Sequence, residues 1–459
     1  MMHRRQVLAS LPVIAATACG DVPLPQTRPP IPARFPYAPA ETGWPDPSWW
    51  QAFGSAELNA LVDAAATGNR DLLAAAERII QAEAGARADR ASLFPSLGFG
   101  ASTSTGTNSG PGSWTAGVDA SWEVDLWGRL RSAARAGDMR TLSSRFDRDA
   151  LALSVMAETA TGYFQLLAFR ARRTQASETL TVARRILGVV MVQVSAGGSS
   201  DLETQQQRSA VAAQEASLAE LTGRERQQLH ALALLAGVGP EEVIATARSL
   251  EGLSLPPVVA GLPADLLARR PDIARAEADL VAAGLDARIA RDARLPSLTL
   301  TGSAGRSTTE LADLLLSPGR LATRIIASLG APLFEGGRLR AAEDQAMSRM
   351  RELAQRYAAT ILEAFRDVAD ALAATEAARE AYALRRLAFD SASRAYRIGD
   401  VRWRAGGADF LSVLQSQQAL FSTADLLAQA DAARYSAAVA LYRALGGGWQ
   451  VPPGLRVQG

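Results

Sequence analysis

The sequence has no lysine, one cysteine and only two histidines among its 459 residues. A single cysteine excludes an internal disulfide framework, and so few cysteines and histidines exclude a metal site rich in these residues. The 48 basic residues, all arginines, nearly balance the 47 acidic ones, so the charge predicts no nucleic-acid partner. After the N-terminus, no apolar run reaches the roughly 18 residues that a membrane-spanning helix needs.

Motifs that carry enzyme chemistry are also missing. The chain contains no GxSxG nucleophile elbow, no metal-ligand cluster and no phosphate-binding loop. These absences predict a protein that is not an enzyme and that needs no cofactor. They also argue against a lipid-anchored periplasmic enzyme, an alternative that the N-terminus described next would allow.

The first 18 residues have the pattern of a secretory signal peptide, with Arg4 and Arg5 before an apolar run. Small residues directly before Cys19 resemble a bacterial lipobox, which implies cleavage before Cys19 and lipidation of that residue. A plain cleavage site near an ordinary cysteine is the alternative, and the arginine pair leaves secretion by the Sec or the Tat route open. Residues 19–55 are rich in proline and predict an extended segment.

A strand with two different faces is predicted at residues 114–125. Apolar and polar residues alternate there with a period of two, and the polar face carries three carboxylates, unlike the interior of a soluble core. Further strands are predicted at about 96–105, 297–306 and 322–331, which gives two hairpins.

A very long helix is predicted to follow the first hairpin. Residues 129 to about 194 contain no proline and only three glycines, and about 65 helical residues span roughly 100 Å. Such a length without a break is typical of a coiled coil. A turn at 196–200 and a helix over about 202–236 bring the chain back.

The second half of the chain repeats the first. Gly128-Arg129-Leu130-Arg131 is echoed about 200 residues later by Gly337-Arg338-Leu339-Arg340. In each repeat the long helix roughly equals the two shorter helices laid end to end. The predicted divisions are a signal peptide at 1–18, a lipidated segment at 19–55, a first repeat at 56–250, a linker at 251–264, a second repeat at 265–448 and a tail at 449–459.

The predicted fold class is mainly α with a four-stranded β contribution. Four strands of about ten residues are long enough to cross an outer membrane when tilted, but they cannot close, and open edges are not tolerated in lipid. Three chains that share one barrel give twelve strands, wide enough to hold water. We therefore expect a homotrimer with a transmembrane β-barrel in outer-membrane lipid, above a tunnel of long antiparallel coiled-coil helices.

Several motifs resemble one known family, in order along almost the whole mature chain. They are the paired Gly-Arg-Leu-Arg motifs and the stretches 269–277, 333–337 and 445–449. Together they resemble the outer-membrane factors, the TolC-like channels of tripartite efflux pumps, in the lipidated NodT-type branch. The resemblance implies a trimeric outer-membrane lipoprotein that extends into the periplasm and works with a periplasmic adaptor and an inner-membrane pump.

The resemblance also implies a periplasmic gate at the helix turns far from the barrel. Lipidated members narrow this mouth with a leucine ring and an aspartate ring four residues apart. The matching positions here are Leu411 and Gln415, with the repeat mates Leu202 and Gln206, so the acidic ring is absent at that level. Asp409 and Asp201 lie nearby and can supply the charge instead. The alternative is that both leucines are ordinary coiled-coil seam residues.

The same turns are where the resemblance places the adaptor. The candidates for this contact are the small residues Ala196, Gly197, Gly198, Ala405, Gly406 and Gly407. Small side chains leave a notch for a partner hairpin, although the turn itself is sufficient reason for glycine. In the strands, Asp119, Glu123 and Asp125 are expected to face pore water, with a solvated face without selectivity as the alternative.

The predicted function is a passive exit duct for drugs or other small molecules, from the pump and adaptor to the exterior. The alternative is a coiled-coil stalk in the outer membrane without a conducting pore. The stalk does not explain the paired hairpins with carboxylates on one face.

Overall fold

The computed structural model describes residues 22–25, 27–37, 43–104, 112–198, 200–243, 245–257, 260–316 and 321–452. The predicted signal peptide, Cys19 and the last seven residues of the predicted tail lie outside this part of the chain.

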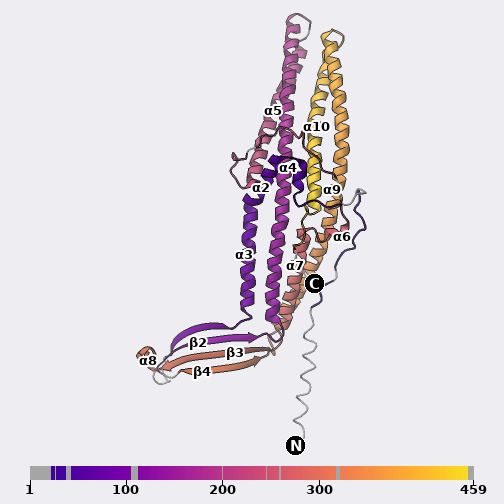
Figure 1. Ribbon diagram of the computed structural model, residues 1–459. Coiled ribbons are helices and arrows are strands. Elements are labelled where there is room, and N and C mark those ends of the chain that lie inside the picture. The colour runs from indigo at the N-terminus through magenta and orange to yellow at the C-terminus, as the bar shows by residue number, and fades with distance from the viewer. Residues whose placement is uncertain are drawn as a thin grey trace.

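Long helices dominate the described residues and stand on one small sheet (Figure 1). The first half contains η1 (Trp49–Phe53), α2 (Ala56–Gly68), α3 (Arg70–Ala91), β1 (Ser96–Ser104), β2 (Ser113–Val124), α4 (Arg129–Ser195) and α5 (Asp201–Ala236). The second half contains α6 (Pro263–Leu266), α7 (Pro271–Asp292), β3 (Ser297–Thr308), α8 (Leu311–Leu316), β4 (Ala322–Gly330), α9 (Arg338–Arg404) and α10 (Phe410–Ala444). The duplicated order confirms the predicted mainly α fold class with two internal repeats.

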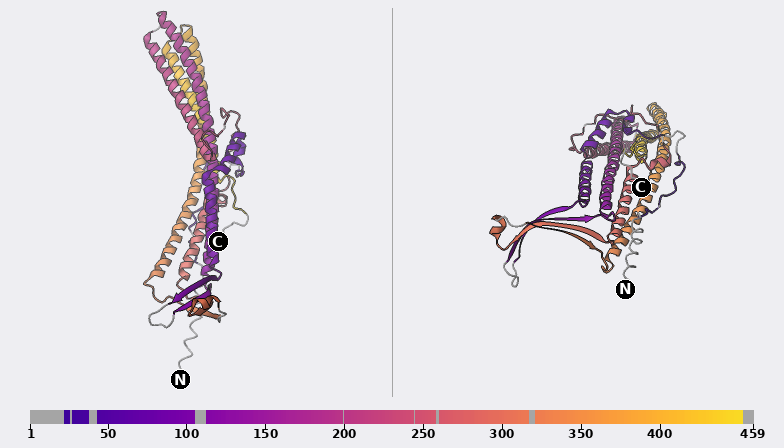
Figure 2. Two further views of the ribbon diagram at one scale, coloured as in Figure 1. Left: turned by 90° about the vertical axis from the view of Figure 1, so that its left-hand side faces the viewer. Right: turned by 60° about the horizontal axis from the view of Figure 1, so that its bottom comes forward.

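The helices α4 and α9 run from the sheet to the far tip (Figures 1 and 2). Each has 67 residues, which corresponds to roughly 100 Å of helix. Helix α3 packs along the lower half of α4 and α5 along its upper half, while α7 and α10 pack in the same way along α9. Because α7 and α10 also contact α4, the two repeats form one antiparallel bundle.

In the first repeat, α5 meets the start of α3 end to end at mid-height. The Asn69 side chain accepts the backbone N–H of Leu72 at 3.1 Å, and its amide donates to the Leu235 carbonyl near the end of α5 at 3.0 Å. Gly237 then ends α5 in the left-handed conformation, with φ of +72°. A Cβ on Gly237 would stand 1.9 Å from the Gly68 carbonyl oxygen, so only glycine fits this junction.

The second repeat builds the same junction from other residues. The Arg270 guanidinium donates to the Ala444 carbonyl at 3.2 Å, which links the start of α7 to the end of α10. Gly446 has a φ of +85°, and a Cβ there would stand 2.0 Å from the Arg269 carbonyl oxygen. In each repeat, two shorter helices joined end to end therefore lie beside one continuous long helix.

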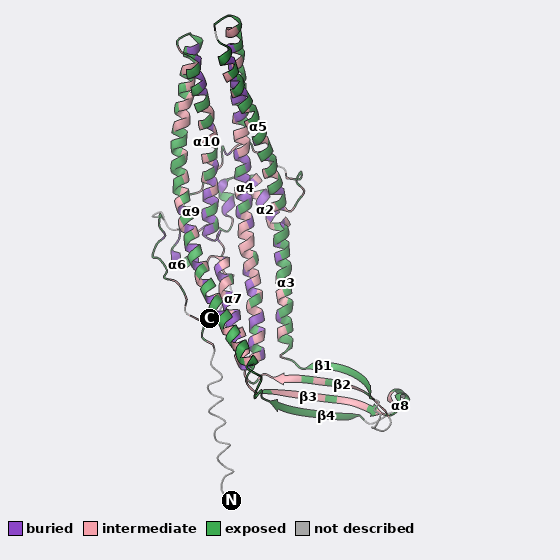
Figure 3. Cartoon of the chain, turned by 180° about the vertical axis from the view of Figure 1, so that it is seen from behind, coloured by how far each residue is buried: buried purple, intermediate pink, exposed green. Residues whose placement is uncertain are grey.

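The sheet is antiparallel, and its strands follow the order β1-β2-β3-β4. The pairing of β2 with β3 joins the two repeats, with Val118 opposite Ala304. In the described part of the chain, neither β1 nor β4 has a neighbour on its outer side. These two strands are fully exposed, whereas β2 and β3 are partly covered (Figure 3).

One face of the sheet is apolar and open. The register places Phe99 opposite Val118 and Leu298 opposite Leu329 on this face. Phe99 is 76% exposed and Ile325 is 87% exposed, values that no packed core would show.

The buried core lies at mid-height, where η1 and α2 pack against α4 and α10. Phe53, Phe164 and Tyr435 are buried and pack closely with tilted rings, with 4.8 Å between the ring centroids of Phe53 and Phe164. Trp49 stacks on Tyr442 in the same cluster. Among the described residues, no helix has the length and apolar character needed to cross a membrane.

Candidate functional site

Two helix turns form the tip of the bundle, one between α4 and α5 and one between α9 and α10 (Figure 1). Both close in the same way: Gly198 donates to the Gln193 carbonyl at 2.8 Å, and Gly407 donates to the Arg402 carbonyl at 2.8 Å. Gly197 and Gly406 each have a φ of +75°, which favours glycine. The turn geometry is therefore sufficient reason for these two glycines, and adaptor docking at the turns stays a prediction.

The turns also leave open space. A Cβ on Gly197 or Gly406 would meet nothing within 4 Å, and one on Gly198 or Gly407 would make only ordinary contacts with backbone oxygens. Ala196 and Ala405 end the preceding helices. The predicted docking residues thus form two turns with open space around them.

The leucines predicted for the gate do not lie in the buried seam of the protomer. Leu202 is 65% exposed and Leu411 is 51% exposed. The seam at this height is made by other apolar residues: Ile186, Val190, Trp403, Phe410, Val413 and Leu414. Within one chain, the two leucines are therefore not buried seam residues of the coiled coil. Their side chains are exposed to solvent or to neighbouring molecules.

The polar gate candidates also lie at the surface of the tip. Gln415 is exposed, and Gln206 is half-buried. Asp409 caps α10 and accepts the backbone N–H of Ser412 at 2.8 Å. The hydrogen bonds from Ser412 hold the pKa of the Asp409 carboxyl below its usual range. Asp201 is exposed in the first turn of α5, so negative charge stands next to each leucine.

The three strand carboxylates have different surroundings. Asp119 is exposed within β2, opposite Ser303 of β3. Glu123 forms an ion pair with Arg129 at 2.7 Å, at the end of β2 nearest the helices. Asp125 follows the last residue of β2, and its carboxylate accepts the backbone N–H groups of the first residues of α4. Asp119 alone stands along the strand without a salt bridge in the described residues.

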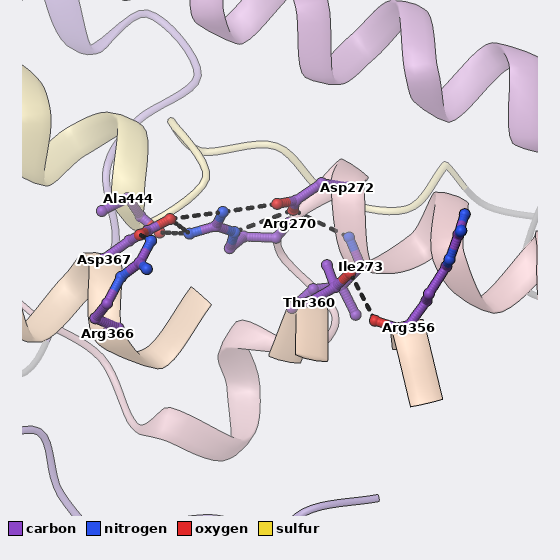
Figure 4. Close-up of polar contacts among 8 residues, drawn as sticks. All are labelled: Arg270, Asp272, Ile273, Arg356, Thr360, Arg366, Asp367 and Ala444. Atoms are coloured by element: carbon purple, nitrogen blue, oxygen red, sulfur yellow. Dashed lines mark hydrogen bonds and ion pairs between the residues drawn. The ribbon is translucent and has the colours of Figure 1, made fainter. Parts of the chain in front are cut away.

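Sequence reasoning missed the cluster around Arg270 (Figure 4). Its guanidinium is 12% exposed and pairs with Asp272 at 2.6 Å and with Asp367 of α9 at 3.2 Å. Burial lowers the pKa of Arg270, but the two aspartates outweigh this effect and the net pKa shift is upward. Two sequence signals pointed to this position: Arg270 occupies the repeat position of Asn69, and it lies in the stretch 269–277 that resembles the family. Nothing in the sequence showed that both side chains reach the end of a helix more than 160 residues away.

Comparison with known proteins identifies the class. The family model for the outer membrane efflux protein matches residues 61–238 and 262–447. The pyoverdine export outer membrane protein OpmQ of Pseudomonas aeruginosa is 36% identical over 453 residues, covering 94% of each chain. The solvent efflux pump outer membrane protein SrpC of Pseudomonas putida is 32% identical over 464 residues, covering 96% of this chain and 98% of SrpC.

Solved structures have the same fold. The outer-membrane channel OprN gives a TM-score of 0.87 at 28% identity, with 93% of this chain and 99% of OprN covered. The open state of the MtrE outer membrane channel of Neisseria gonorrhoeae gives 0.85 at 27% identity, with 94% of this chain and 99% of MtrE covered. The chain belongs to the outer membrane efflux protein family. It is an outer-membrane efflux channel whose helices extend into the periplasm.

Proposed function

We propose that three copies of this chain close one barrel, through which small molecules leave the cell passively. The observation that carries the proposal is the pair of free edges. Strands β1 and β4 have nine residues each, and the outer edge of each has no partner in the described part of the chain. Backbone groups at such an edge cannot remain unpaired in lipid, so β4 of one copy pairs with β1 of the next.

The strand lengths support this arrangement. The two central strands have 12 residues each. At about 3.3 Å per residue and a tilt of about 45°, such a strand rises roughly 28 Å, close to the apolar band of about 25 Å in outer-membrane barrels. The open apolar face, with Phe99 and Ile325, then faces lipid, and Asp119 faces the water of the pore.

The channel performs no chemistry in this proposal. A periplasmic adaptor docks at the tip turns, and an inner-membrane pump supplies the energy and selects the cargo. The relatives named above export pyoverdine and solvents, which supports small-molecule cargo without identifying the cargo of this chain.

Conductance in planar bilayers tests the duct, because a stalk without a pore gives no channel events. Cysteine pairs with one member on β1 and one on β4 test the shared barrel, and we expect disulfide-linked trimers. The matched control is a pair at Thr115 and Ser307, which face each other across β2 and β3 and should crosslink only within one chain. Crosslinks confined to single chains for both pairs would refute the trimer.

The adaptor contact has a selective test. Gly198 and Gly407 do not have positive φ values, so larger residues can enter there without straining the turns. We expect Gly198→Leu with Gly407→Leu to weaken adaptor binding, measured by co-purification, while the helix content is unchanged. Unchanged co-purification would assign these glycines to the turn alone.

The exposed leucines are proposed to narrow the periplasmic mouth. Leu202→Ser with Leu411→Ser should raise single-channel conductance, because the two side chains project from the tip surface. Leu387→Ser is a matched control, since Leu387 is 61% exposed but lies on α9 away from the turn. Equal conductance of both variants and wild type would remove the leucines from the gate.

We also propose that Cys19 carries the lipid anchor. The residues just after it support this, because Val22 packs against the α7–α9 cluster and Leu24 fits over Gly284 of α7. A Cβ on Gly284 would stand 2.7 Å from the Leu24 Cδ2 atom, so the segment occupies a defined notch. Mass spectrometry of the mature N-terminus tests the modification, and an unmodified Cys19 would contradict it.

A further inference from the structure

A cavity of about 250 Å³ lies where β2 turns into α4, beside the end of α7. Three of the lining residues are arginines and none is acidic. The lining consists of Leu126, Trp127, Gly128, Arg131, Ser132, Arg135 and Arg288. Such an excess of positive charge around a small cavity requires an explanation, since like charges repel.

Two of these arginine side chains lie close to Gly128. Gly128 lacks a side chain and has a φ of +83°. At the point where its Cβ would stand, the Arg288 Nη2 atom is 3.4 Å away and the Arg131 Nη2 atom is 3.9 Å away. Arg131 comes from α4 and Arg288 from α7, so the fold brings together guanidinium groups from different repeats.

The nearby carboxylates pair with two of these three arginines and neutralise part of the charge. Asp125 binds the Arg131 Nε atom at 2.9 Å and also accepts two backbone N–H groups of α4. Asp292 lies 3.5 Å from the Arg288 Nε atom and also pairs with Arg291 at 3.1 Å. Arg135 is exposed, and no ion pair involves it within the described part of the chain.

The second repeat carries the same Gly-Arg-Leu-Arg motif without the convergence. A Cβ on Gly337 would meet nothing within 4 Å, and Arg340 is exposed. Within one chain, the motif alone therefore does not create the site.

The cavity lies at the edge of the apolar sheet. The apolar face ends at Val124, and the indole N–H groups of Trp122 and Trp127 donate to the backbone carbonyls of Leu93 and Pro296 at 3.0 and 2.7 Å. Tryptophan favours the interface between membrane and water. Leu126 is 48% exposed at the cavity and offers apolar surface beside the arginines.

We propose that this cavity binds the phosphate group of an anionic phospholipid headgroup in the periplasmic leaflet of the outer membrane. Arginine matches phosphate through paired, charge-assisted hydrogen bonds. Basic pockets at the membrane surface recognise anionic headgroups. The assignment rests on the proposed placement of the sheet in the membrane.

Native mass spectrometry of the full-length, detergent-purified protein tests the site. We expect retention of phosphatidylglycerol over phosphatidylcholine, and Arg135→Gln and Arg288→Gln should each weaken retention about fivefold, the effect of roughly one interfacial arginine. Arg379→Gln, at an exposed arginine of α9 far from the sheet, should leave it unchanged. Equal retention of the two lipids, or an equal loss in Arg379→Gln, would overturn the proposal.

Two further measurements complete the test. In the first, millimolar inorganic phosphate is added at constant ionic strength. Displacement of the lipid would assign the site to free phosphate and overturn the proposal of a lipid ligand. If Arg288→Gln fails to fold, lipid retention by the wild-type protein is measured at rising salt concentration. Lipid held by arginines must be lost as salt rises, so salt-independent retention would refute the site. Planar-bilayer conductance of Arg135→Gln should equal that of wild type, which separates failure of the lipid site from failure of the channel.

Discussion

The end-to-end helix junctions make the sharpest prediction. Gly237→Ala and Gly446→Ala should each destabilise the protein by about 2–5 kcal/mol. Part of this, about 1–2 kcal/mol, is the cost of a side chain in the left-handed conformation. The rest, about 1–3 kcal/mol, is the cost of overpacking, because the new Cβ would stand 1.9 or 2.0 Å from a backbone carbonyl oxygen.

The tip turns provide the control. Gly197 and Gly406 have a similar φ of +75° but open space around them. Alanine at these positions should therefore cost only the conformational part, about 1–2 kcal/mol. The comparison isolates the contact between helix ends from the strain of the backbone.

Circular dichroism at 222 nm on heating is a suitable assay, with all variants in one detergent and at one protein concentration, because the apparent midpoint of an oligomer depends on concentration. We expect both junction variants to melt well below both tip variants. Equal midpoints for all four would refute the reasoning, since the helix ends would then separate without cost.

Three further outcomes are expected. Arg270→Gln should cost about 3 kcal/mol, because two aspartates lose a mostly buried partner, and thermal unfolding measures it; no change would contradict the junction role. Burial raises the pKa of Glu277 above its usual value of 4.5, although Arg28 opposes this. Its favourable contribution is therefore complete below about pH 4.5 and is lost as the pH rises through the raised pKa, so Glu277→Gln should gain on wild type in melts at pH 8 but not at pH 4. The lowered pKa of Asp409 gives the opposite sign: its cap stabilises above about pH 3.8 and fails as the pH falls through the lowered value. Hydrogen exchange at Ser412 should therefore be faster in Asp409→Ala at pH 7, and equal exchange would refute the cap.

The sequence was sufficient for the architecture, because local patterns determine it. A period of two predicts which face of β2 is apolar, and a long stretch without proline predicts α4. The duplication predicts that α9 copies α4, and both have 67 residues. The first two inferences need only residues that are neighbours along the chain, and the third needs only a comparison of two segments of the sequence.

The tertiary structure alone decided which distant residues meet. Leu202 and Leu411 could be seam residues by sequence, yet Phe410 and Val413 fill the seam and both leucines are exposed. Likewise, Gly128 and Gly337 share one motif, but only Gly128 receives an arginine from α7. Periodicity determines the faces of each element, whereas the contacts at element ends depend on how far and in which direction other segments reach.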